Sequence, residues 1–164
     1  MVDDMNNVRD FAKKKHMEQR YGIFPYIHHL TCTYNVACLF KLSDNIKVAC
    51  WLHDTLEDTK TTYDELVTHF GLEVAEMVYC VTDELGRNRK EQKTKTYPKI
   101  KANPDAIYVK LCDRIANIEA SIENNPHKLD KYLTEHKDFV DALYTPHDSE
   151  KPIWIHYFSL ISSI

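Results

Sequence analysis

Apolar residues recur every three or four positions along two long stretches of this chain, a spacing typical of amphipathic helices. The first stretch holds Val74, Met77, Val78, Val81 and Leu85, and the second holds Ile107, Leu111, Ile115, Ile118 and Ile122. No convincing alternation of apolar and polar residues competes with this pattern. Only three glycines occur in 164 residues, which argues against a loop-rich or all-β fold. We therefore predict an all-α helical bundle that forms one domain over residues 1–164.

Local signals predict the ends of the first helices. A helix is expected from about Asp3 to Arg20, and the chain should break at 22–25 because proline disfavours helical geometry in the residue before it. A second helix should cover residues 28–40. Ser43 is expected to cap a third helix that begins at Asp44 and carries residues 48–59.

Similar signals mark the later helices. Thr62 and Glu65 have the spacing of a capping box, and Gly71 can end the helix that they begin. Asn103 and Pro104 are a suitable cap and first-turn pair. Two more helices are expected near residues 128–144 and 150–162, the last one capped by Ser149.

Charge and composition exclude several classes of partner. A net charge of −4 and a pI of about 6.1 give no overall attraction to nucleic acid or to an anionic membrane. No stretch approaches the roughly 18 apolar residues of a membrane span, and the N-terminal residues lack the apolar core of a signal peptide. The five cysteines form no C-x-x-C pair and lie mostly among apolar neighbours. We expect reduced, buried thiols in a cytoplasmic protein.

The segment WLHDTLEDT, residues 51–59, carries the strongest chemical signal. On one continuous helix, His53 and Glu57 are four residues apart, as are Asp54 and Asp58, so all four side chains share one sector. The clustered carboxylates would repel one another unless a positive charge lay among them. An imidazole beside carboxylates at the edge of an apolar run is suitable chemistry for a metal ion.

Other segments could complete such a site. The segment PYIHH places His28 and His29 at the start of a helix, and Asp113 lies on a strongly apolar helix where an unpaired charge is costly to bury. Lys110 and Asn117 share the polar side of that helix with Asp113. Residues 87–101 hold seven Lys or Arg residues and one Glu. This basic segment is either a solvated polar helix or loop, or a source of cations near an anionic substrate.

Six motifs, in order, resemble those of a known family. They are AKKKHMEQR, PYIHH, WLHDTLEDT, TTYDELVTHFG, CVTDE and VKLCDRIANI. With them, roughly residues 8–144 resemble the HD-domain phosphohydrolases, and within these the guanosine tetraphosphate hydrolases of the SpoT and small MESH1 type. The resemblance implies a nucleotide substrate and metal-dependent hydrolysis of the 3′-pyrophosphate of (p)ppGpp, giving GDP or GTP and pyrophosphate.

The resemblance also implies roles for individual residues. It implies a Mn²⁺-like ion held by His29, His53, Asp54 and Asp113. It implies that Glu57 and Asp58 position and activate the hydrolytic water. On the same basis, Arg20 would lie near the purine, and Asn117 and Tyr132 near the nucleoside. In such a reaction, Lys110 and the basic segment would stabilise the growing charge on the phosphoryl oxygens. His28 stands at a variable position of its motif, and we interpret it as structural or exposed.

The chain departs from the family pattern at two places. Leu30 follows His29 where the family usually has proline, and residues 21–24, YGIF, replace a longer and more polar turn. The YGIF segment keeps one alternative open, the hydrolysis of another nucleotide such as NADPH or a (d)NTP. A non-catalytic nucleotide-binding module is a second alternative, and the presence of all four implied ligands with Glu57 and Asp58 argues against it. The C-terminal PIWIHYFSLISSI matches no motif. It is expected to be a packing helix or else a self-association surface of a homo-oligomer.

Overall fold

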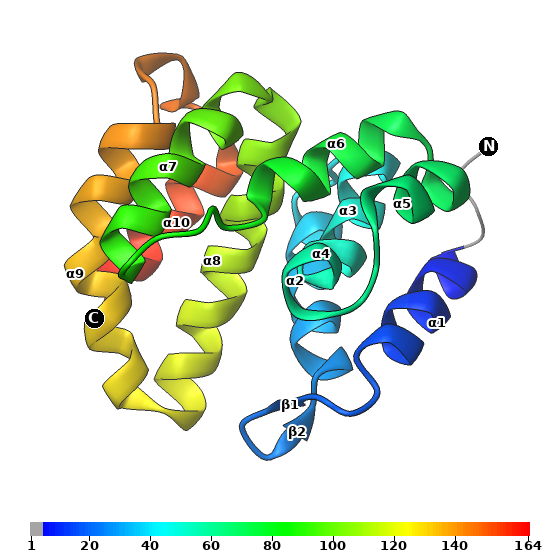
Figure 1. Cartoon of the computed structure of the whole chain (residues 1–164). Helices are drawn as coiled ribbons and strands as arrows, with labels where there is room; N and C mark the ends of the chain where they lie inside the picture. Colours follow the sequence, from blue (N-terminus) through cyan, green and yellow to red (C-terminus); the bar gives the residue numbers. More distant parts are fainter. Residues whose placement is uncertain (1–4) are drawn as a thin grey trace.

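The computed structural model describes residues 5–164, which fold into helices arranged around one long central helix, α8 (Figure 1). The helices are α1 (Met5–Lys15), α2 (Ile27–Leu39), α3 (Asp44–Leu52), α4 (Thr55–Asp58), α5 (Tyr63–Phe70), α6 (Leu72–Val81), α7 (Arg89–Ala102), α8 (Pro104–Asn124), α9 (Pro126–Leu143) and α10 (Pro152–Ser162); a 3-10 helix covers Pro146–Asp148. Strands β1 (Arg20–Tyr21) and β2 (Phe24–Pro25) pair as an antiparallel hairpin. The all-α prediction is confirmed.

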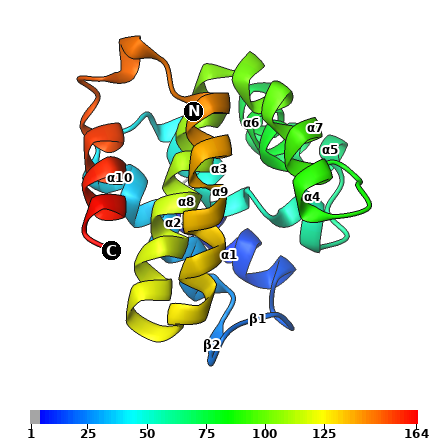
Figure 2. The ribbon, with the colours of Figure 1, turned by 90° about the vertical axis from the view of Figure 1, so that its left-hand side faces the viewer.

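Helix α8 joins the two halves of the molecule. It packs against α2, α3 and α6 on one side and against α7, α9 and α10 on the other (Figure 1). The view at right angles places α10 and α7 on opposite sides of the α8–α9 pair (Figure 2). The predicted stripe accounts for this position, because Leu111, Ile115 and Ile118 are fully buried. The stripe ends in solvent at Ile122, which is 43% exposed.

Side-chain caps begin three helices where the sequence predicts them. The Ser43 hydroxyl accepts a hydrogen bond from the Ile46 amide at 3.4 Å, and Thr62 accepts one from Glu65 at 3.2 Å. Asn103 Oδ1 accepts from the first two free amides of α8 at 3.1 and 3.2 Å. Gly71 ends α5 with a φ of 85°, a left-handed conformation that favours glycine.

The prediction of one helix through residues 44–59 is wrong. Helix α3 ends at Leu52 and the single turn α4 begins at Thr55. The break is local, because the Thr55 hydroxyl donates to the Leu52 carbonyl at 2.6 Å and the His53 ring contacts the Cys50 carbonyl at 2.9 Å. These side chains compete with the backbone for the last carbonyls of α3. His53 and Asp54 therefore lie at a corner between two helices.

Three other predicted ends also differ. Helix α1 ends at Lys15 rather than Arg20, because the chain turns into the β1–β2 hairpin, where Gly22 has a φ of 60°; the predicted start at Asp3 lies outside the described residues. Helix α6 ends at Val81, which leaves Leu85 in a loop with 88% of its surface exposed. Ser149 does not cap α10, because it follows a 3-10 helix closed by Thr145 and Asp148; Lys151 precedes α10 instead.

The C-terminal helix packs into the core. Trp154 and Tyr157 are almost fully buried, and the ring of Tyr157 lies 5.5 Å from that of Phe139 on α9. All five cysteines are free, with Cys50, Cys80 and Cys112 buried. Among the described residues, no helix is both long and apolar enough to cross a membrane.

Candidate active site

A polar cavity of about 170 Å³ lies where α2, α4 and α8 meet α7 and α9. Ionisable side chains of both signs line it. The carboxylates are Asp54, Glu57, Asp58, Asp83 and Asp113, and the basic residues are Arg89, Lys93, Lys110, Arg114 and Lys131. The cavity is thus built for a ligand that carries more than one charged group.

Three buried side chains, from α2, from the corner after α3 and from α8, converge at one end of this cavity. The Nε2 atoms of His29 and His53 are 3.3 Å apart. Asp113 Oδ1 lies 3.3 Å from His29 Nε2 and 3.5 Å from His53 Nε2. Nitrogen and oxygen ligands at about 2.0–2.2 Å from one ion are themselves separated by about these distances. The three residues could therefore hold a metal ion.

Asp54 adds a fourth donor atom. Its Oδ2 lies 3.0 Å from His53 Nε2 and 3.6 Å from His29 Nε2. The corner between α3 and α4 places the carboxylate there, and the Tyr26 hydroxyl donates to the same oxygen at 2.6 Å. The structure thus brings together all four residues that the sequence predicts as metal ligands. Two imidazoles and two carboxylates are a donor set that suits a borderline-to-hard divalent ion.

Electrostatics keep the two carboxylates of this set ionised, which is the form that binds a metal ion. Burial would raise the pKa of Asp113, but Lys110 and the two histidines hold it well below its usual value. Burial likewise opposes ionisation of Asp54, yet His53 and His29 lower its pKa. Burial would lower the pKa of His53, and the two neighbouring carboxylates outweigh this effect and raise it well above its usual value. A divalent cation would take over the role of that proton.

Glu57 and Asp58 line the cavity but stand outside the close cluster of His29, His53 and Asp113. Glu57 accepts a hydrogen bond from the Asp83 amide at 2.9 Å, and Asp58 accepts one from the Tyr26 hydroxyl at 3.3 Å. Burial raises the pKa of both carboxylates. Two carboxylates of raised pKa beside a metal-binding cluster are suited to general acid–base work.

Three of the predicted substrate-binding residues also line the cavity: Lys110, Asn117 and Tyr132. Lys110 donates to Asp113 Oδ2 at 2.9 Å, and Asn117 donates to Asp113 Oδ1 at 2.5 Å. Arg20 is different. It is exposed on the hairpin, donates to the Ile23 carbonyl at 2.5 Å and is not among the lining residues of this cavity in the described part of the chain.

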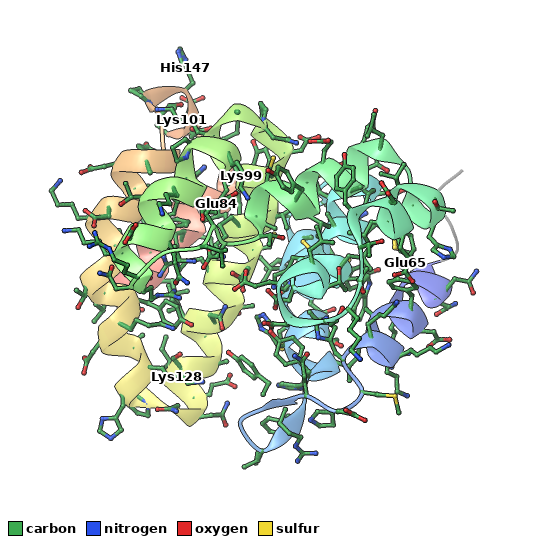
Figure 3. The ribbon with its side chains drawn as sticks, viewed as in Figure 1. Glu65, Glu84, Lys99, Lys101, Lys128 and His147 are labelled. Carbon is green, nitrogen blue, oxygen red and sulfur yellow. The ribbon has the colours of Figure 1, made fainter. Side chains whose placement is uncertain are left out.

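The basic segment divides between solvent and cavity. Lys93 is buried, contacts both Asp83 oxygens at 2.6 and 2.8 Å, and lines the cavity with Arg89. Burial and the nearby Lys110 lower the pKa of Lys93 to about 8. Lys99 pairs instead with Glu84 at 2.6 Å, away from the cavity lining (Figure 3). Arg89 and Lys93 of this segment therefore line the cavity, whereas Lys99 does not.

Sequence reasoning did not single out several residues that contact the site. Tyr21 and Tyr26 contact it from the hairpin and the start of α2, Asp83 anchors Glu57, and Arg114 lies over the Tyr132 ring at 5.1 Å. Asp83 and Tyr26 stand inside recognised motifs, which was an available signal. His28 is half-buried and stacks on Phe24 at 4.4 Å, in agreement with the structural interpretation.

Comparison with known proteins assigns the family. Residues 8–146 match the HD domain family. This chain belongs to the HD domain family. Its HD domain is 37% identical over 125 residues to the guanosine-3′,5′-bis(diphosphate) 3′-pyrophosphohydrolase of Aquifex aeolicus, covering 72% of the chain and 18% of that relative. It is also 37% identical over 122 residues to mouse MESH1, which carries the same enzyme name, covering 66% of the chain and 64% of MESH1. The match thus spans less than two thirds of either relative.

A solved structure shares the fold of this HD domain. It is described as a metazoan ortholog of SpoT that hydrolyses ppGpp, and it superposes with a TM-score of 0.83 over 99% of this chain and 96% of the other. Sequence identity in that superposition is 21%, so the likeness concerns the arrangement of helices.

Proposed function

We propose that this HD domain is a metal-dependent phosphohydrolase that removes the 3′-pyrophosphate of (p)ppGpp. The observation that carries the proposal is the convergence of four donor atoms, from His29, His53, Asp54 and Asp113, with separations of 3.0–3.6 Å between the imidazole nitrogens and their neighbours. The activity for which the Aquifex and MESH1 relatives are named supports the choice of reaction.

We propose that these four residues hold Mn²⁺ or a similar divalent ion. When bound, such an ion supplies Lewis acidity and lowers the pKa of water. Lys110 would keep Asp113 ionised, since its ammonium lies 2.9 Å from Asp113 Oδ2. Tyr26 would hold Asp54 through the hydrogen bond to Oδ2.

The remaining steps concern protons and phosphate charge. The water oxygen bonds to the phosphorus attached to the ribose O3′, the O3′–P bond breaks, pyrophosphate leaves, and O3′ gains a proton. Glu57 or Asp58 would take the proton of the attacking water, a role that their raised pKa favours. Lys93, Arg89 and Lys110 would stabilise charge on the phosphate oxygens.

The nucleoside would lie beside Asn117 and Tyr132, which line the cavity. Contact between Arg20 and the purine stays a prediction, since its guanidinium bonds to the hairpin backbone. The apolar hairpin favours a second candidate, hydrolysis of another nucleotide such as NADPH or a (d)NTP.

Free cysteines agree with the proposed cytoplasmic location. Self-association through the C-terminal segment, where Ile155 of α10 is exposed, stays a prediction.

The test is a product assay. Purified protein with Mn²⁺ is incubated with ppGpp, NADPH and a panel of dNTPs, and products are separated by chromatography. Release of pyrophosphate from ppGpp, with little turnover of the others, supports the proposal. Turnover of NADPH or a dNTP alone selects the second candidate. Metal binding without turnover of any substrate would indicate a non-catalytic module.

A further inference from the structure

Two of the basic residues that line the cavity, Arg89 and Arg114, share one carboxylate. Glu135 Oε2 accepts a hydrogen bond from Arg114 Nη1 at 3.0 Å and one from Arg89 Nη2 at 3.2 Å, and Arg89 Nε donates to Glu135 Oε1. Lys93 and Lys110, by contrast, each pair with a separate carboxylate of the cavity lining. Two guanidinium groups beside a single carboxylate leave one positive charge that is not balanced within this trio.

Glu135 holds the two arginines from outside the cavity. It belongs to α9, whereas Arg89 begins α7 and Arg114 lies on α8, and these three helices pack against one another (Figure 1). Both arginines line the cavity that contains the metal-binding cluster. Glu135 is absent from that lining and instead lines a groove of about 510 Å³ between α7 and α9. The carboxylate therefore brings the two guanidinium groups together without taking a place beside a ligand in the cavity.

Burial fixes the position of this trio. Arg114 is buried, and its guanidinium carbon lies 4.6 Å from the centre of the Phe139 ring and 5.1 Å from that of Tyr132. Burial would raise the pKa of Glu135, but the hydrogen bond from Arg89 and the charge of Arg114 lower it. Each guanidinium has five N–H donors, of which Glu135 accepts two from Arg89 and one from Arg114. The planar fork of arginine suits two oxygens of one phosphate group.

We propose that Glu135 is a positioning residue that fixes Arg89 and Arg114 as one binding site for a phosphate group of the substrate. Without the carboxylate, the two guanidinium groups would repel each other, and the phosphate would have to order them when it binds. The inference rests on the proposed function, because it requires a phosphorylated substrate in the cavity. It does not depend on which phosphate bond is cleaved.

The test depends on the direction of a change in KM. If Glu135 acted on the substrate only through its negative charge, Glu135→Gln would remove a repulsion and lower KM. If Glu135 positions the arginines, Glu135→Gln should raise KM for ppGpp about tenfold, because an amide offers one accepting oxygen to two guanidinium groups. The value of kcat should stay close to that of the wild type, since the phosphate would be held alike before and during the reaction.

Two further variants complete the test. Glu135→Asp keeps the charge but withdraws it by one methylene group, and it should raise KM about threefold. The matched control is Asp138→Asn, which removes a carboxylate charge from an exposed residue of the same helix and should leave KM unchanged. Thermal melts check that each variant folds. An unchanged or lower KM in folded Glu135→Gln would overturn the inference, and so would a wild-type KM in Glu135→Asp if Glu135→Gln does not fold.

A binding measurement separates this inference from the proposed function. If no substrate is hydrolysed, calorimetry gives the affinity of the Mn²⁺-loaded protein for inorganic pyrophosphate, and the same ratios between variants are expected. Weaker pyrophosphate binding in Glu135→Gln would then leave the inference standing and remove only the hydrolase proposal. Hydrolysis of ppGpp with a wild-type KM in folded Glu135→Gln would remove only the inference. A wild-type protein that neither hydrolyses ppGpp nor binds pyrophosphate would overturn both.

Discussion

The metal-binding cluster and the basic helix α7 both concentrate charge, yet they use it differently. In the cluster, His29, His53 and Asp113 are buried and come from α2, from the corner after α3 and from α8. On α7 and just before it, charged groups face solvent: Glu91 is shared by Arg87, which precedes the helix, and by Lys95, and the side chains of these two residues are 90% and 50% exposed. Exposed pairs of this kind contribute about 0–1 kcal/mol, whereas a buried charge is costly without partners. Burial therefore distinguishes the charged residues of the candidate site from the solvated ones. The density of charge in the sequence does not.

The largest expected effect lies in the cluster. His53→Ala or Asp113→Ala should lose Mn²⁺ and activity together, because each removes one of the converging donor atoms. Elemental analysis and the ppGpp assay measure the two losses. Asp141→Ala is the control, since Asp141 is 61% exposed and pairs only with Lys137 in the described contacts. Full metal occupancy in both site variants would contradict the ligand assignment.

The next effect separates chemistry from metal binding. Glu57→Gln and Asp58→Asn should keep their metal but lose about 10²–10⁴ in kcat, the usual cost of removing a positioned acid–base group. Each change preserves the shape of the side chain and keeps one accepting oxygen, but it removes the charge and the ability to take up a proton. Near-wild-type kcat in both variants would show that Glu57 and Asp58 are not the catalytic acid–base pair. Loss of metal in either variant would show that the changed residue is itself a metal ligand.

A smaller effect divides α7 itself. Lys93→Met should raise KM about tenfold to a hundredfold, because it removes a buried cation, while Lys95→Met on the exposed side should leave KM unchanged. The pKa of about 8 adds a pH test. Above that pH, Lys93 loses its charge in the free enzyme. The value of kcat/KM of the wild-type protein should therefore decrease as the pH rises above about 8, and this decrease should be absent in Lys93→Met. Equal KM values for both variants would make α7 a solvated helix throughout.

Arg20→Ala should raise KM for a guanosine substrate by at most about tenfold, the scale of one stacking contact. Unchanged KM would leave Arg20 as a residue that closes the hairpin through the Ile23 carbonyl.

The smallest effect on catalysis should come from the cap of α8. Asn103→Ala removes the acceptor of two amides and should lower the free energy of unfolding by about 1 kcal/mol, measured by denaturant titration. Its kcat and KM should match those of wild type. A change in either would show that the position of α8 depends on its first turn.

Helix starts could be predicted because their determinants are adjacent in sequence. Ser43, Thr62 and Asn103 each bond to an amide two or three residues away. The break at His53 could not be predicted from periodicity, because a threonine hydroxyl and an imidazole compete for carbonyls that a continuous helix would also use. The exposed Leu85 could not be predicted for a similar reason. The helical spacing of apolar residues continues to Leu85, although α6 ends at Val81.

For the site, spacing predicted the neighbourhood of His53 and Asp54, and the resemblance supplied His29 and Asp113. The supporting residues were harder to find. Tyr21 stands in the segment that departs from the family pattern, and its contact with Asn117 joins positions 96 residues apart. Lys93 was one of seven basic residues in its segment, and only the packing of α7 shows that it is buried.

The four proposed metal ligands are far apart along the chain, and this spacing bears on how the protein resists unfolding and proteolysis. They stand on α2, at the corner between α3 and α4, and on α8, so an ion that binds them all ties distant segments together as a reversible cross-link. Because the ion binds the folded arrangement of these residues and not the unfolded chain, it shifts the folding equilibrium towards the folded state as the metal concentration rises. The protein should therefore resist proteases less well after treatment with a chelator than in the presence of Mn²⁺.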